Sequence, residues 1–457
     1  MKSITLIILT LISINISAQN ITGTWNGILK VQGIQLRLVF NVTQTEKGYS
    51  STMDSPDQSA KGIPVTTTNF ENSILKLEIS NAGILYEGTL DSDNNINGIF
   101  KQGGQSFPLT LTKNEAETEK LVRPQEPTKP FSYYSEDIKF ENTKDNIELA
   151  GTLTLPQKEG VFPAVILISG SGQQNRDGEL LGHKPFLVLS DFLTKNGIAV
   201  LRFDDRGTAK STGNFKNATT FDFAKDVEYA IKYLKNRKEI NKDKIGLIGH
   251  SEGGIIAPII ASRNKDVDFI VLMAGSALRG DKLLLLQKYK IDTQMGIKKE
   301  VTDFNLQLLS GAYNIILNEN IKNEFISDTL SKYLMLKYNN VLNEGQRAVI
   351  TNQLSSNWMI NFIRLDPAIY LKKVSCPILA INGNKDLQVP SKENLEIIEQ
   401  IYKNSDNNNV EIKELAGLNH LFQECETGAI NEYATIEQTI SPIALKEILK
   451  WINIQIK

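Results

Sequence analysis

The sequence has few of the residues that build metal sites. Two cysteines and three histidines are scattered over 457 residues, and a metal site needs several such ligands close together. A glycine-rich phosphate-binding loop is also missing from the sequence, and such a loop is the signature of most nucleotide cofactor sites. We therefore expect neither a metal nor another cofactor.

The two cysteines, Cys376 and Cys425, allow one disulfide at most. A strand of about seven residues is expected to begin near Cys376, and a strand rises about 3.3 Å per residue. Cys425 is expected at the far end of this strand, too distant for a disulfide. The sequence therefore favours two unpaired cysteines.

An excess of charge of one sign is missing as well. Lys and Arg number 50 against 52 Asp and Glu, so neither nucleic acid nor an anionic membrane surface is expected as a partner. Hydrophobic residues make up 41% and charged residues 22% of the chain, which is typical of a soluble globular protein. The length predicts two or three units of about 100 to 250 residues each.

An apolar run of about 20 residues, the length that spans a bilayer, is missing too. The longest run, Ile4 to Ile16, follows the basic Lys2 and precedes a small-residue site that ends at Ala18. These features are typical of a signal peptide. We predict that residues 1–18 are cleaved off after Ala18 and that the protein is exported, to the periplasm or out of the cell. No membrane span is expected in the mature chain.

Residues 19–112 have the pattern of half-buried strands. Apolar and polar residues alternate between residues 34 and 42, and Leu75, Leu77 and Ile79 repeat the pattern. Strands with two unlike faces predict a small all-β domain, either a barrel or a sandwich. The periodicity stops at residues 113–130, where charges and three prolines predict a stiff, solvated linker.

Residues 131–457 follow a different pattern, in which continuous apolar runs alternate with helical stretches. The runs are 164–168, 198–203, 245–248, 269–273 and 378–381. Strands buried on both faces have such runs, so we predict a mostly parallel sheet with helices on both faces. Residues from about 276 to 373 contain helical patterns without such a run, and they predict an inserted helical cap.

One segment combines a buried strand, a sharp turn and a helix. It contains Gly249-His250-Ser251-Glu252-Gly253. The two glycines lack Cβ atoms where strand and helix crowd together, so Ser251 can lie on a strained turn with its hydroxyl exposed. This pattern predicts a nucleophile elbow, although a purely structural turn is the alternative.

A serine nucleophile needs a base that takes its proton, and histidine is the usual one. His250 is expected to point away from the attacking side of Ser251, and His183 precedes a helix, where a surface or helix-start role is expected. His420 lies in a short loop before the C-terminal helical stretch. Hydrolases whose serine lies on such a turn between strand and helix have their base in a loop at this place, so we predict His420 as the base.

The imidazole of the base needs a carboxylate that fixes its tautomer. Asp386 follows the last apolar run and is expected at the carboxyl end of that strand. The chain order Ser251, Asp386, His420 is the order in which such hydrolases arrange nucleophile, acid and base. We predict Asp386 as the orienting acid, and a simple turn former is the alternative.

Acyl transfer also needs N–H donors for the oxyanion. The loop 169–172 follows the strand expected at 164–168, and we predict the N–H of Ser171 as one donor and the N–H of Glu252 as the other. The glycines of this loop could instead serve only to make a turn. The charged loops 175–178 and 204–207 lie on the same edge, and their charges are expected to brace one another.

From Phe131 to Lys457 the chain resembles bacterial α/β-hydrolases of the esterase and serine-aminopeptidase-like group. The resemblance rests on Ser169-Gly170-Ser171-Gly172, Asp205-Arg206-Gly207, Gly249-His250-Ser251-Glu252-Gly253 and Gly383-Asn384-Lys385-Asp386. Residues 23–111 look like the β-rich extension of some exported members. The resemblance implies the α/β-hydrolase fold and hydrolysis of carboxylic esters, often with short acyl chains. The Ser-Gly-Ser opening of the oxyanion loop departs from the more common His-Gly.

The sequence thus predicts a serine esterase that acts on a small-molecule ester through an acyl-enzyme. The cap is expected to limit acyl size, with Trp358, Met359 and Phe362 as candidate pocket walls. A serine peptidase with the same triad is one alternative. A catalytically inert protein whose β domain binds a glycan or wall polymer is the other. The oligomeric state does not follow from the sequence.

Overall fold

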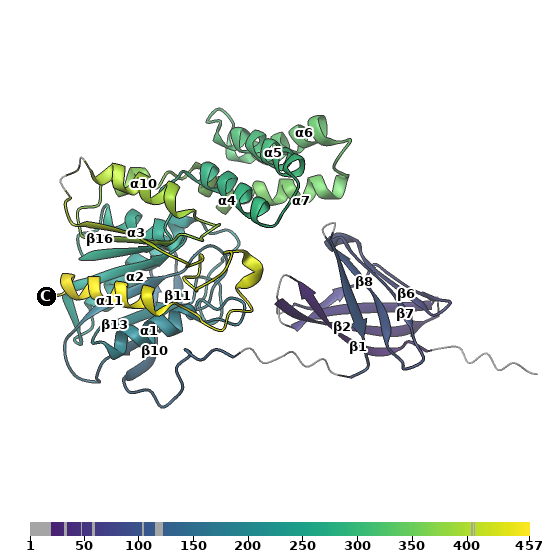
Figure 1. Ribbon diagram of the computed structural model, residues 1–457, viewed down its shortest axis with the longest axis horizontal. Helices are drawn as coiled ribbons and strands as arrows, with labels where there is room; N and C mark the ends of the chain where they lie inside the picture. Colours follow the sequence, from purple (N-terminus) through teal and green to yellow (C-terminus); the bar gives the residue numbers. More distant parts are fainter. Residues whose placement is uncertain are drawn as a thin grey trace, which may run out of the picture. The chain divides into compact units, whose positions relative to one another are not determined.

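The computed structural model describes residues 20–31, 34–46, 48–56, 60–102, 105–114, 122–403, 405 and 407–457. The predicted signal peptide lies outside these residues. The chain divides into two compact units, Met1–Lys120 and Leu121–Lys457, and Figure 1 labels the elements of each. The boundaries predicted at residues 112 and 131 stay predictions.

The described part of the first unit consists of β-strands and one short 3-10 helix, Ser80–Ala82. Its strands are β1 (Gly23–Val31), β2 (Ile34–Thr45), β3 (Gly48–Ser55), β4 (Ala60–Pro64), β5 (Thr67–Glu71), β6 (Ile74–Ile79), β7 (Ile84–Leu90), β8 (Ile96–Gln102) and β9 (Gln105–Leu111). They form sheets of four and five strands, in chain order. Asn26 and Thr112 exchange backbone hydrogen bonds of 2.7 and 2.8 Å, which join β1 to the end of β9. The all-β prediction is confirmed.

Strand β6 illustrates why this unit folds as predicted. Leu75, Leu77 and Ile79 are buried, and Lys76 between them is exposed and pairs across the sheet with Glu87 at 3.0 Å. The period-2 pattern therefore separates an apolar core face from a charged outer face.

The second unit is built on an eight-stranded sheet. Its strands are β10 (Tyr134–Asn142), β11 (Ile147–Leu155), β12 (Phe162–Ile168), β13 (Ala199–Phe203), β14 (Ile240–His250), β15 (Phe269–Met273), β16 (Ile378–Gly383) and β17 (Val410–Leu415). The order is β10-β11-β13-β12-β14-β15-β16-β17. The pairs β10–β11 and β11–β13 are antiparallel, and all later pairs in this order, from β13 to β17, are parallel. The mostly parallel sheet is confirmed.

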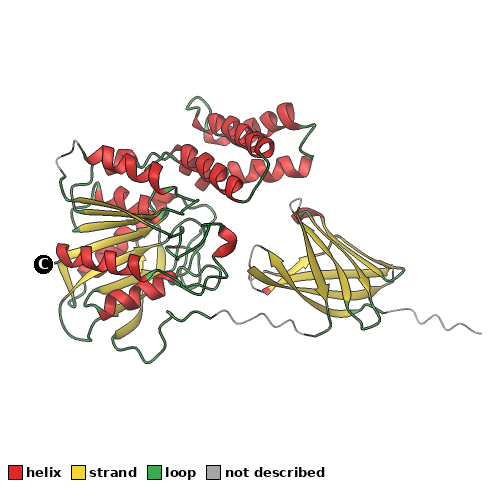
Figure 2. Cartoon of the chain, viewed as in Figure 1, coloured by secondary structure: helices red, strands yellow, loops and turns green. Residues whose placement is uncertain are grey.

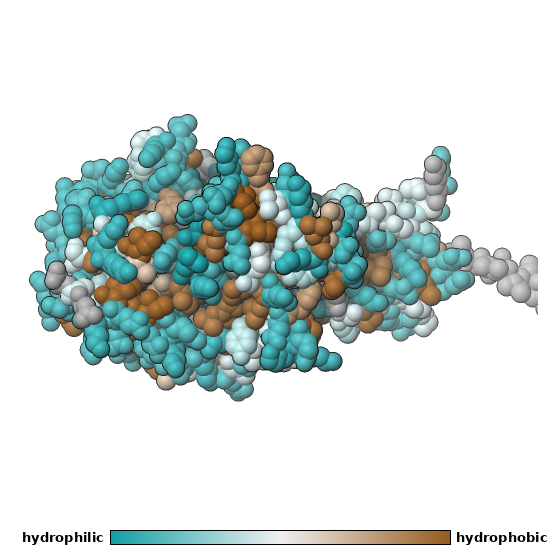
Figure 3. Space-filling model, turned by 90° about the horizontal axis from the view of Figure 1, so that it is seen from above, coloured by the Kyte–Doolittle hydropathy of each residue, from teal (hydrophilic) through white to brown (hydrophobic). Residues whose placement is uncertain are grey.

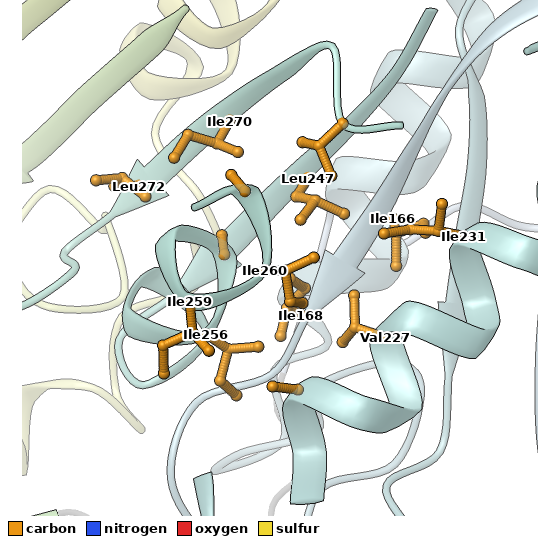
Figure 4. Packing of buried hydrophobic residues seen from close by; sticks show 14 of the residues in the cluster. Ile166, Ile168, Val227, Ile231, Leu247, Ile256, Ile259, Ile260, Ile270 and Leu272 are labelled. Atoms are coloured by element: carbon orange, nitrogen blue, oxygen red, sulfur yellow. The ribbon is translucent and has the colours of Figure 1, made fainter. Parts of the chain in front are cut away.

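Helices cover both faces of this sheet (Figure 2). They are α1 (Pro185–Lys195), α2 (Thr220–Lys235), α3 (Gly253–Ala261), α10 (Ser391–Tyr402) and α11 (Pro442–Gln455). Ile166 and Ile168 of β12 pack in one core with α2 and α3 (Figure 4), and α10 contributes to the same core. Val165 and Leu167, which alternate with them, pack in a second core with α1 and α11. Burial on both faces explains the continuous apolar runs.

A helical insertion lies between β15 and β16. It contains α4 (Gly280–Gln294), α5 (Lys299–Leu317), α6 (Ile326–Tyr338), α7 (Glu344–Leu354), α8 (Asn357–Arg364) and α9 (Ala368–Leu371). It has a hydrophobic core of its own, with Ile316, Leu330 and Ile360. This insertion is the predicted cap.

Apolar side chains also reach the surface. On the face shown in Figure 3 they form brown patches separated by polar side chains. Within the described part of the chain, no helix combines the length and the apolar character that crossing a membrane requires.

Part of the segment predicted as a solvated linker belongs to the second unit, which begins at Leu121. Arg123 donates hydrogen bonds to the carbonyl oxygens of Leu181, Gly182, Ala434 and Ile436, at 2.8 to 3.2 Å. The prediction is therefore wrong for Arg123. A single arginine among charges and prolines has no periodic pattern, so its partners far along the chain were not predictable.

Candidate active site

The turn between β14 and α3 has the geometry of a nucleophile elbow. Ser251 has a φ of 55°, a left-handed conformation that is strained for a residue with a side chain. A Cβ atom on Gly249 would lie 2.0 Å from the oxygen of Gly253, and one on Gly253 would lie 2.2 Å from the oxygen of Ile168. No side chain fits at such distances. The two glycines therefore have the steric role that the sequence predicts.

Ser251 lies in the wall of a cavity of about 200 Å³. His420, Glu252 and Ser171 line the same cavity. The cap contributes Leu283, Leu284, Gln287, Trp358 and Phe362. The structure thus brings together the predicted nucleophile, base and oxyanion residues. Met359 is instead buried in the core of the cap.

His420 forms a hydrogen bond with Asp386. The distance from Nδ1 to the carboxylate Oδ2 is 2.7 Å, and both side chains are buried. The other carboxylate oxygen accepts hydrogen bonds from the backbone N–H groups of Gln388 at 2.8 Å and Val389 at 2.9 Å. In the tautomer whose proton is on Nδ1, the imidazole donates this hydrogen bond to Asp386. Nε2 is then free to accept a proton.

His250 lies closer to the site than the sequence suggests. It lines the cavity, and its Nε2 donates a hydrogen bond to the backbone oxygen of His420 at 2.9 Å. Burial lowers the pKa of His250 to about 3, so the ring is neutral. The prediction that it points away is wrong, because this hydrogen bond and the ring contact, with centroids 4.8 Å apart, hold His250 beside His420.

The surface or helix-start role expected for His183 is also wrong. It is 1% exposed and not at the surface. Its Nε2 lies 2.9 Å from the backbone oxygen of Tyr433, and its Nδ1 lies 3.0 Å from the hydroxyl of Thr439. Burial lowers its pKa to about 4. His183 is therefore a neutral histidine that holds the C-terminal loop by hydrogen bonds.

The loop after β12 approaches Ser251 closely. A Cβ on Gly170 would lie 3.1 Å from the Cβ of Ser251, and the next residue, Ser171, lines the cavity. Glu252 directly precedes α3, and N–H groups at a helix start have no partner within the helix. The donor roles of Ser171 and Glu252 stay predictions.

The Glu252 side chain has contacts that the sequence does not reveal. It is 2% exposed and accepts hydrogen bonds from the Thr220 hydroxyl at 2.6 Å and from Trp358 Nε1 at 3.0 Å. Burial raises the pKa of Glu252. Glu252 thus connects the elbow with α2 and with the cap.

The charged loops at this edge of the sheet brace one another, as predicted. Arg176 of one loop pairs with Asp204 of the other at 2.8 Å. Asp177 pairs instead with Arg202, which belongs to β13. Among the described residues, no group of three or more His, Cys, Asp or Glu could hold a metal ion.

Comparison with known proteins adds independent information. The model of the family described as Serine aminopeptidase, S33 matches residues 185–426, which include Ser251, Asp386 and His420. Esterase EstD of Thermotoga maritima is 26% identical over 364 residues, covering 79% of this chain and 75% of that protein. Acyl-coenzyme A thioesterase 1 of Mus musculus is 30% identical over 125 residues, 27% of this chain and 26% of that protein. A solved Pyrococcus furiosus esterase matches with a TM-score of 0.46 and 18% identity, covering 75% of this chain and 100% of that one.

Proposed function

Because the chain belongs to the serine aminopeptidase S33 family, we propose that it is a serine esterase for short acyl groups, with Ser251 as nucleophile, His420 as base and Asp386 as orienting acid. The observation that carries this proposal is the buried hydrogen bond between His420 and Asp386 in the wall of the cavity that Ser251 also lines. The S33 description names a peptidase, so ester and amide substrates have to be separated by experiment.

The proposed reaction has two halves. His420 Nε2 takes the hydroxyl proton as Ser251 Oγ attacks the ester carbonyl, and the N–H groups of Ser171 and Glu252 stabilise the oxyanion. Collapse of this intermediate breaks the bond to the alcohol, which receives the proton from His420. Water, deprotonated by His420, then attacks the acyl-enzyme. Collapse of this second intermediate breaks the ester bond to Ser251, whose Oγ takes the proton back from His420 as the acid leaves. Asp386 stays ionised throughout and stabilises the imidazolium.

The cavity supports a compact, uncharged substrate. Its volume of about 200 Å³ is below the range of about 300 to 1,000 Å³ that is usual for ligand pockets. Lys and Arg do not occur among its described lining residues, which include Glu252. Coenzyme A esters carry phosphates, which are typically bound by Arg or Lys, so the cavity favours simple esters over acyl-coenzyme A. The similarity to an esterase over 79% of the chain also favours esters.

A panel of matched substrates tests this function. We expect kcat/KM to be highest for acyl chains of two to four carbons and to fall about 10-fold or more at eight carbons, because the cap walls limit the space. An aminoacyl ester should be cleaved much faster than the matching amide, since an amine is the poorer leaving group. Comparable rates on ester and amide would instead support the peptidase.

Leu284→Ala provides the matched variant for this panel. Leu284 belongs to the cap wall and is only partly buried, so its truncation enlarges the cavity at modest cost in stability. The preferred acyl length should increase by about one or two carbons. An unchanged chain-length profile would contradict the assignment of this wall to the acyl group.

We also propose that the protein is exported and that residues 1–18 are removed. The basic Lys2, the apolar run 4–16 and the small Ala18 support this. N-terminal sequencing of protein from the periplasm or the medium of producing cells should give Gln19 as the first residue. Ala18→Arg should block cleavage. Protein that still begins with Met1 in those fractions would contradict the proposal.

A further inference from the structure

Asp205 binds both ends of the loop that carries the predicted oxyanion donor. Its Oδ1 accepts a hydrogen bond from the Ser169 hydroxyl at 2.6 Å, and its Oδ2 accepts one from the Gln174 backbone N–H at 2.9 Å. Its own N–H donates to the backbone oxygen of Gln174 at 3.1 Å. Ser171 lies between these two attachment points.

The position of Asp205 is unfavourable for a carboxyl group. It follows β13, is 8% exposed, and burial raises its pKa to about 7. The neighbouring guanidinium groups bind other carboxylates: Arg176 pairs with Asp204, and Arg206 pairs with Asp226 at 2.7 Å. A buried carboxyl without a cation lowers stability, and such residues gather at functional sites.

The loop has further contacts besides those with Asp205. Gly170 passes close to Ser251, because a Cβ atom on Gly170 would lie 3.1 Å from the Cβ of Ser251. Gln174 Nε2 also donates to the backbone oxygen of Ser171 at 3.3 Å. The loop is thus held by Asp205 at Ser169 and Gln174, and it is braced internally at Ser171.

We propose that Asp205 is a positioning residue. It holds the loop 169–174 in place so that the backbone N–H of Ser171 faces the oxyanion formed at Ser251. The inference rests on the proposed function. Oxyanion donors act at about 2.7 to 3.1 Å from the developing charge, and a misplacement of about 1 Å costs on the order of 100-fold in rate. Asp205 acts through the loop and does not touch the substrate.

Asp205→Ala tests this role, because it removes the acceptor of both ends of the loop and leaves Ser251 and His420 in place. We expect kcat on an activated short-chain ester to fall about 100-fold. Affinity for a trifluoromethyl ketone, which forms an oxyanion adduct with Ser251, should fall in parallel. Affinity for the matching methyl ketone, which binds without an adduct, should stay within about 3-fold of the wild type.

Two further variants separate positioning from folding. Asp205→Asn should restore most of kcat, because its amide oxygen accepts from Gln174 and its N–H₂ group can donate to the Ser169 hydroxyl. Asp292→Ala removes another buried carboxyl, that of the cap pair with Lys288, and should lower thermal stability without changing the ratio of the two ketone affinities. Equal losses for both ketones in Asp205→Ala would overturn the proposal.

If Asp205→Ala does not fold, Ser169→Ala removes one of the two attachments and should show the same split between the ketones on a smaller scale. A variant without this split would equally overturn the proposal. The rate of fluorophosphonate labelling provides a readout that does not depend on an ester substrate. A wild type that is labelled but cleaves no ester would contradict the proposed substrate, while slower labelling of Asp205→Ala would still support the positioning role.

Discussion

Replacing Ser251 with alanine is expected to abolish fluorophosphonate labelling and to lower kcat for ester hydrolysis by at least about 10⁴-fold. Only a serine activated by a base reacts with this reagent at a useful rate. Alanine and serine have similar backbone preferences, and the Ser251 N–H can still donate to the Met273 oxygen, now at 2.9 Å. The fold should therefore persist. Labelling followed on a gel and kcat measured on an activated ester check both expectations.

Ser262→Ala is the matched control, because Ser262 lies at the other end of the same helix, α3. It should be labelled like the wild type. If Ser251→Ala were still labelled, another serine would be the nucleophile. If the wild type were not labelled at all, the inert binding protein would become the better hypothesis.

Asp386→Asn is expected to lower kcat about 10⁴-fold with little change in melting temperature. The backbone N–H groups of Gln388 and Val389 both point at one oxygen of Asp386, so the amide oxygen of asparagine will take that position. Its N–H₂ group then faces His420 Nδ1 and donates to it. The imidazole proton moves to Nε2, and His420 can no longer accept the proton of Ser251. kcat near neutral pH and a thermal melt measure the two effects.

Asp303→Asn controls for the loss of one carboxylate, because Asp303 forms an exposed pair with Lys299 in the cap. Its kcat should match the wild type. An Asp386→Asn variant that keeps more than about a tenth of wild-type kcat would contradict the role of Asp386 and leave it as a turn former.

The sheet of the second unit was predictable where both of its faces are buried. Residues 164–168 and 269–273 are continuous apolar runs because helices cover them on both sides. β17 at the edge was missed. It carries Glu411 and Lys413, and most of its residues are only partly buried. An edge strand is exposed on one side, so its sequence lacks the apolar run.

The core of the candidate site was predictable because its chemistry needs particular residues in a particular order. The glycines around Ser251 follow from steric crowding, and Asp386 and His420 follow from chain order. The residues around this core were not predictable. The side chains of Asp205, Glu252 and His183 depend on contacts across the fold, such as that of His183 with Thr439, although the backbone N–H of Glu252 was predicted as a donor. No local pattern encodes such contacts.

The hydrogen bonds of Arg123 have a consequence for exchanging the β-rich unit between relatives. The guanidinium group donates to carbonyl oxygens of two segments that are far apart in the sequence. One segment contains Leu181 and Gly182, and the other contains Ala434 and Ile436. A chain that starts at Phe131 loses the donor that these four oxygens share. In a chimera of two relatives, the junction must therefore lie before Arg123 if the second unit is to keep these hydrogen bonds.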